Sequence, residues 1–156
     1  MRTIIMLILT VLGLALQPLS AQNTEGSDNY KYYKAVELLD EGGDPQEARK
    51  LAVENIKANP KHIDSYLLIA GIDRREADYA SALRQIEQAM KNNHRDSGFS
   101  EALLLWWKAI IYDELGNTRK AVDTMEQVVK MARKTDKEHL VSMMENLAEF
   151  RYDLAA

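Results

Sequence analysis

Apolar residues recur every three or four positions from about residue 29 to the end of the chain, which is the spacing of one face of an α-helix. Turn-forming residues interrupt this pattern and divide it into seven predicted helices. The first ends at Gly42-Gly43, the second runs from Asp44-Pro45 to Asn59-Pro60, the third spans about Ile63 to Glu76, the fourth about Tyr79 to Lys91, the fifth Ala102 to Leu115, the sixth begins at Asn117 or Thr118, and the seventh begins at Thr135-Asp136.

Local chemistry supports several of these boundaries. Asp44 can cap the second helix, Pro45 suits a first turn that needs no donor, and Glu47 would complete a capping box. The seventh helix has an apolar stripe made of Leu140, Met143, Met144, Leu147 and Phe150, and we expect its far side to offer Lys137, Glu138, Glu145, Glu149 and Arg151 to water. The chain is therefore predicted to be all-α.

The second helix of each consecutive pair carries an alanine at the same position. Superposing the starts of these helices brings Ala48, Ala82 and Ala121 into register, with separations of 34 and 39 residues. The longer separation includes the polar stretch 93–100, where extra residues cost little. Two helices approach to about 8–10 Å only where the facing side chains are small, so we expect these alanines at helix crossings.

This pattern resembles the tetratricopeptide repeat family, whose period is 34 residues. The resemblance is carried by aromatic residues Tyr32 and Tyr66, small residues Ala70 and Ala109, tyrosine Tyr112, turn glycines Gly43 and Gly116, and the unit-ending Pro60. Val36 stands at the small position of the first unit, and Asp73 at the tyrosine position of the second. The resemblance implies a right-handed α-solenoid with units of about 29–62, 63–96 and 102–135 and a capping helix over 136–156. An array built on a different helix pair remains an alternative.

By the family's pattern, the first helix of each unit lines a concave face that binds a protein or peptide. The implied lining is Tyr30, Tyr33, Glu37, Asp40 and Glu41, then Asp64, Leu67, Gly71, Arg74 and Arg75, then Leu103, Trp106, Ile110, Asp113 and Glu114. Its acidic residues favour a basic or amphipathic partner, and Arg74-Arg75 forms a basic step. Tyr30, Tyr33 and Trp106 could instead belong to the core.

The first residues have the features of an export signal. Arg2 supplies a positive charge, residues 4–16 form an apolar run, and small residues follow at Ser20-Ala21. The run is shorter than the roughly 18–20 residues that span a membrane. We expect a signal peptide over 1–21, a polar linker over 22–28, and a periplasmic or extracellular mature domain. An uncleaved membrane anchor is the alternative.

Composition excludes several classes of function. The net charge is −4, which disfavours nucleic acid as a partner. The chain has no cysteine, which excludes disulfides, thiolate metal sites and a cysteine nucleophile. His62, His94 and His139 lie in different units, and each is expected to be exposed at a helix end. With no phosphate loop or nucleophile elbow, the sequence predicts no metal, no cofactor and no catalysis.

The sequence therefore favours an exported protein–protein interaction scaffold. The alternative is a structural subunit that stacks on copies of itself or on a larger complex. An enzyme would need an enclosed polar pocket, which an array of three helix pairs rarely forms.

Overall fold

The chain is all-α over the residues that its computed structural model describes, 29–93, 101–135 and 139–155. These residues form seven helices and no strand: α2 (Tyr30–Asp40), α3 (Pro45–Ala58), α4 (Ile63–Arg75), α5 (Tyr79–Asn92), α6 (Glu101–Glu114), α7 (Thr118–Thr135) and α8 (Leu140–Ala155). The all-α prediction is confirmed for this part of the chain. The expected signal peptide (1–21) and linker (22–28) lie outside it.

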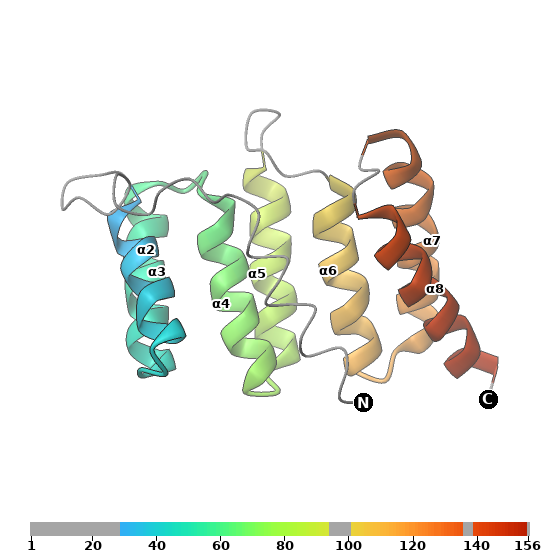
Figure 1. Cartoon of the computed structure of the whole chain (residues 1–156), viewed down its shortest axis with the longest axis horizontal. Coiled ribbons are helices and arrows are strands. Elements are labelled where there is room, and N and C mark those ends of the chain that lie inside the picture. The colour runs from blue at the N-terminus through green and yellow to red at the C-terminus, as the bar shows by residue number, and fades with distance from the viewer. Residues whose placement is uncertain (1–28, 94–100, 136–138, 156) are drawn as a thin grey trace.

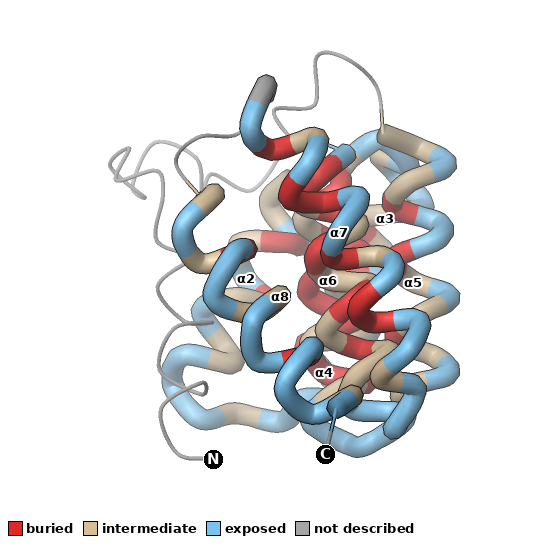
Figure 2. The backbone as a smooth tube through the Cα atoms, turned by 90° about the vertical axis from the view of Figure 1, so that its right-hand side faces the viewer, coloured by how far each residue is buried: buried red, intermediate tan, exposed pale blue. Residues whose placement is uncertain are grey.

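The helices stand side by side in chain order along the long axis of the molecule (Figure 1). Packing is most extensive between α2 and α3, α4 and α5, α6 and α7, and α7 and α8, and less extensive between α3 and α4 and between α5 and α6. Seen along the row, α2, α4, α6 and α8 form one layer and α3, α5 and α7 form the other (Figure 2). Buried residues gather between the two layers.

The core has three successive parts, and each combines two consecutive helices with the helix that follows them. Leu68, Ile69 and Ile72 of α4 pack into the cluster of α2 and α3. Leu104 and Ile111 of α6 do the same for α4 and α5. Met143 and Phe150 of α8 join the cluster of α6 and α7. Each helix pair therefore buries its apolar face only with the help of the next element.

Completely buried alanines stand on both helices of each pair. Ala48, Ala82 and Ala121 are completely buried. On the opposing helices, Ala70 and Ala109 are also completely buried, as is Ala35 of α2. Val36, which the repeat pattern places at the small position of the first unit, is only partly buried, so Ala35 provides the small side chain there. The absence of longer side chains lets the helix backbones approach closely.

Helices α2, α4 and α6 end in the same way, with one residue in the left-handed conformation. Gly42 has φ 75°, Ala77 has φ 59° and Gly116 has φ 72°. The N–H of the following residue bonds back to a carbonyl five positions earlier: Gly43 to Leu38, Asp78 to Asp73 and Asn117 to Tyr112. This is the hydrogen bond of a Schellman motif. In the first turn Gly42 carries the positive φ, and Gly43, which was matched to the turn glycine of the repeat pattern, follows it.

Gly43 is required for a different reason. A Cβ atom on Gly43 would clash with the Leu38 side chain and lie 2.9 Å from the Leu38 carbonyl oxygen. The turn between α2 and α3 is one residue longer than the turn between α4 and α5. Despite this difference, α3 and α5 have the same register relative to the helices that precede them.

The predicted start of α3 is confirmed, whereas the predicted start of α8 is wrong. Asp44 caps α3 as expected, but its side chain accepts the N–H of Gln46 at 2.9 Å. Thr135 does not begin the last helix: α7 continues through Thr135, and α8 begins at Leu140. Met144, expected in the apolar stripe of α8, is exposed on its outer side. The polar residues expected there are exposed at Glu145, Glu149 and Arg151.

Candidate partner-binding face

One side of α4 lies between α2 and α6, and we call it the α4 face: Asp64, Leu67, Gly71, Arg74 and Arg75, of which Leu67 is buried in the core. At its N-terminal end, burial and then the nearby Asp64 carboxylate raise the pKa of the Tyr33 phenol on α2. At its C-terminal end, Nε of Arg74 donates to Glu114 of α6 at 2.8 Å. Neighbouring helices therefore flank this face on both sides.

Gly71 lies in the middle of the α4 face and leaves a gap there because it has no side chain. It lies inside α4, and its φ is not in the left-handed region. Apart from its chain neighbours and the nearby backbone of α4, no atom of the described residues would lie within 4 Å of a Cβ added there. Glycine inside a helix costs about 1 kcal/mol relative to alanine. Neither backbone conformation nor crowding by the described residues explains this cost.

Aromatic and acidic groups surround the N-terminal end of the α4 face. Tyr32 is buried, and its ring meets the ring of Tyr33 edge to face at 5.3 Å and that of His62 at 4.7 Å. Tyr30 and Tyr33 are partly exposed, and Glu37 is exposed. Burial raises the pKa of Asp64 to about 6, partly offset by a backbone hydrogen bond. Asp64 is therefore a carboxylate that water solvates poorly, although 36% of its side chain is exposed.

His62 is not an exposed helix-end histidine, and this expectation was wrong. Only 11% of its side chain is exposed, and burial lowers its pKa to about 4. Its Nδ1 lies 2.9 Å from Oγ of Ser65, which also accepts from Nδ2 of Asn55 at 3.1 Å. Its Nε2 lies 3.9 Å from Asp64. His139 is half-buried beside Trp106, and His94 lies outside the described residues.

The Ser65–His62–Asp64 arrangement has the residue types of a nucleophilic triad but not its accessibility. Ser65 is completely buried in the contact between α3 and α4. A nucleophile must reach a substrate carbonyl that is also within reach of oxyanion donors. Ser65 meets no such requirement, and its hydroxyl instead satisfies Asn55 and His62 in the interior.

The basic step at Arg74-Arg75 differs from the sequence-based expectation. Arg74 is held by Glu114, and both side chains are largely buried in that ion pair. Arg75 is exposed. Among the described residues, Arg75 is therefore the unengaged positive charge on the α4 face.

Helix α8 covers Trp106, the aromatic residue of the third unit that was expected to line the concave face. Trp106 is buried, and its Nε1 donates to Oδ1 of Asn146 at 2.7 Å. Ile110 packs against the same cluster. Burial raises the pKa of Asp113, with Asp153 and Glu149 of α8 adding to the shift. Trp106 therefore belongs to the core, which is the alternative that the sequence left open.

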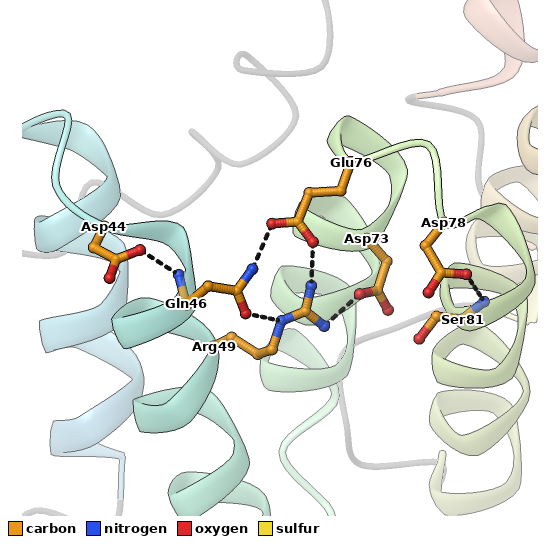
Figure 3. A network of polar contacts seen from close by, with 7 residues as sticks. All are labelled: Asp44, Gln46, Arg49, Asp73, Glu76, Asp78 and Ser81. Atoms are coloured by element: carbon orange, nitrogen blue, oxygen red, sulfur yellow. Dashed lines mark hydrogen bonds and ion pairs between the residues drawn. The ribbon is translucent and has the colours of Figure 1, made fainter.

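A polar network that the sequence did not indicate joins α3 to α4 (Figure 3). Arg49 pairs with Asp73 through one nitrogen and with Glu76 at 3.0 Å through the other. Gln46 accepts from Nε of Arg49 at 3.2 Å and donates to Glu76 at 2.5 Å. Asp73 stands where the repeat pattern has tyrosine, and that departure was the one available signal.

The described residues hold neither a metal-ligand cluster nor a membrane-spanning helix. No group of three or more histidine, aspartate or glutamate side chains there is placed to hold a metal ion. Within the same residues, none of the helices combines the length and apolar character needed to cross a membrane. The sequence matches no protein-family model, and no curated protein is significantly similar to it.

Proposed function

We propose that this protein is an exported scaffold of three tetratricopeptide-like helix pairs and a capping helix, and that it binds a protein or peptide on the α4 face. Such a scaffold performs no reaction and needs no cofactor or metal. It acts by presenting a fixed surface whose shape and charge select the partner. The observation that carries this proposal is Gly71, an open glycine inside a helix on a surface flanked by two other helices.

The repeat architecture is supported by features that recur at matching positions. In each proposed pair, the first helix ends with one residue in the left-handed conformation: Gly42, Ala77 and Gly116. Buried alanines recur in the second helices. The three-part core, in which every pair leans on the following helix, is what a stacked array requires. The array would be right-handed, as in the family that the sequence resembles.

The partner's chemistry follows from the charge and shape of the face. Glu37, Asp64 and Asp113 offer carboxylates, and Arg74 is neutralised by Glu114. A basic or amphipathic segment complements this surface. Partly exposed Tyr30 and Tyr33 supply aromatic area, which is often the energetic anchor of an interface. A backbone or small side chain of the partner would lie against Gly71.

Affinity capture from the envelope fraction of the exporting cell tests the proposal. The bait is the chain, compared with Gly71→Gln, which fills the gap with a good helix former, and with the control Val53→Gln on α3. We expect a stoichiometric partner with the unmodified chain and with Val53→Gln, and its loss with Gly71→Gln. Equal recovery by all three baits would remove the α4 face from the account.

The alternative is a structural subunit that stacks on copies of itself. The exposed apolar residues outside the α4 face, such as Val53 and Leu115, are the observation in its favour. A monomer at every concentration in sedimentation equilibrium would count against this alternative.

A further inference from the structure

Helix α8 exposes an apolar stripe on the side that faces away from α7. Val141, Met144 and Tyr152 are 67%, 45% and 76% exposed. With the exposed alanines they form the α8 stripe: Val141, Met144, Ala148, Tyr152 and Ala155. Their spacing of three or four residues places them on one side of the helix. Figure 2 looks onto this end of the molecule, with exposed residues recurring along α8.

The α8 stripe is not a normal ending for such a molecule. A terminal helix in a stacked array usually offers a polar outer face, because nothing covers it. Met143 and Phe150 already form the buried side of α8. The exposed methionine and tyrosine are therefore not needed to hold α8 in place. Methionine adapts to varied surfaces, and tyrosine is enriched in interfaces.

The charges beside the stripe differ between its two flanks. At 100° per residue, Glu145 and Glu149 lie on one flank and Arg151 on the other. Arg151 is already paired with Glu126 of α7 at 2.8 Å. Neither Glu145 nor Glu149 forms an ion pair within the described part of the chain. The net uncompensated charge beside the α8 stripe is negative.

We propose that the α8 stripe docks a basic amphipathic helix of a partner protein, in which an apolar stripe is flanked by lysine or arginine. Apolar area provides the contact, and the partner's cations lie beside Glu145 and Glu149. Ala148, at the middle of the stripe, lets the two helices cross closely. A second copy fits less well, because an antiparallel pair of α8 helices related by a two-fold axis places the acidic flanks side by side.

The test uses the full chain and two labelled synthetic helical peptides, followed by fluorescence anisotropy. One peptide has a leucine stripe flanked by lysine, and the other has the same stripe flanked by glutamate. We expect the lysine peptide to bind at least tenfold more tightly. Glu145→Gln with Glu149→Gln should weaken its binding about fivefold, equivalent to two exposed ion pairs. Val141→Ser with Tyr152→Ser should weaken it at least tenfold.

The control is Leu115→Ser, which removes an exposed apolar side chain away from α8 and should leave binding unchanged. Circular dichroism should show that all variants melt close to the unmodified chain, since the replaced side chains are exposed. Equal binding of the two peptides, or binding that the α8 variants do not alter, would overturn the proposal. A dimer in sedimentation equilibrium that Val141→Ser with Tyr152→Ser dissolves would assign the stripe to a second copy instead.

This inference does not depend on the α4 face. Gly71→Gln leaves the α8 stripe intact, so peptide binding should persist in that variant. Failure of the α4 face and failure of the α8 stripe therefore give different results.

Discussion

The guanidinium of Arg49 in α3 is paired with the carboxylate of Asp73 in α4, and that carboxylate is 98% buried. The second oxygen of Asp73, Oδ2, has no hydrogen-bond partner among the described residues. A buried charge is tolerable only while its counter-charge remains in place. Because α3 and α4 pack less extensively than the helices within each pair, this ion pair fixes how the first pair sits against the second.

Removing one member of this pair is expected to destabilise the chain strongly. Arg49→Ala leaves Asp73 charged and buried, and we expect a loss of about 3–5 kcal/mol in the free energy of unfolding. The double variant Arg49→Met with Asp73→Leu removes both charges and should recover most of that loss. Urea denaturation measures both. Equal destabilisation by the single and double variants would show that the ion pair does not control this contact.

Ala77 is expected to be a strained residue that glycine improves. Its φ of 59° is costly for a side chain with a Cβ atom, whereas Gly42 and Gly116 occupy the matching positions without strain. Ala77→Gly should raise the free energy of unfolding by about 1 kcal/mol, and Gly116→Ala should lower it by about the same amount. Thermal melting monitored by circular dichroism would reveal the two shifts. Destabilisation by Ala77→Gly would contradict the assigned turn.

His62 and Asp64 are expected to give opposite dependences of stability on pH. The pKa of His62 is lowered from 6.5 to about 4. The unfolded chain therefore binds the His62 proton first, and stability falls as pH drops from 6.5 to 4. The pKa of Asp64 is raised from 3.8 to about 6. The folded chain takes up the Asp64 proton first, and stability rises as pH drops from 6 to 3.8.

The two effects partly cancel in the unmodified chain, and single variants separate them. In Asp64→Asn only the His62 effect remains. The free energy of unfolding of this variant should fall by up to about 3 kcal/mol between pH 6.5 and 4, relative to the double variant His62→Gln with Asp64→Asn, which lacks both groups. His62→Gln leaves the Asp64 effect, with a smaller slope of opposite sign, because water screens the exposed part of Asp64. Urea midpoints at pH 4, 5, 6 and 7 measure both slopes. Slopes of the same sign would refute the assignment.

Ala82 tests whether the crossing of α4 and α5 needs a small side chain. Ala82 is completely buried, whereas Ala80 on the same helix is exposed. Ala82→Leu should destabilise the chain by about 3 kcal/mol because the longer side chain separates the helices. Ala80→Leu adds the same atoms on the solvent side and should change stability little. Similar melting temperatures for both variants would contradict the close crossing.

Local signals explain how much of the helical fold could be predicted. Asp44 and Pro45 mark the start of α3 because capping depends on neighbouring residues. The start of α8 was misplaced because the polar residues between α7 and α8 contain no glycine or proline. Periodicity alone cannot say where one helix stops within such a run. Likewise, two consecutive glycines after α2 concealed which of them takes the left-handed conformation.

The candidate site was predicted less completely, because contacts between distant residues decide it. Trp106 is covered by Asn146, which lies 40 residues further along the chain. The Arg74–Glu114 pair likewise spans 40 residues and removes a charge that looked free. Asp73 and Arg49 are 24 residues apart. No local pattern encodes such pairings, whereas Glu37 and Arg75, which form no such pair among the described residues, keep the exposure expected of them.

Gly71→Ala is the most direct test of the α4 face as a binding surface, because one methyl group affects the chain and its partner in opposite ways. Inside a helix with open space around it, alanine should raise the free energy of unfolding by about 1 kcal/mol. The same methyl group should weaken binding of the captured partner severalfold, measured by isothermal titration calorimetry. A more stable chain with reduced affinity is the predicted result. A more stable chain with unchanged or increased affinity would contradict the account.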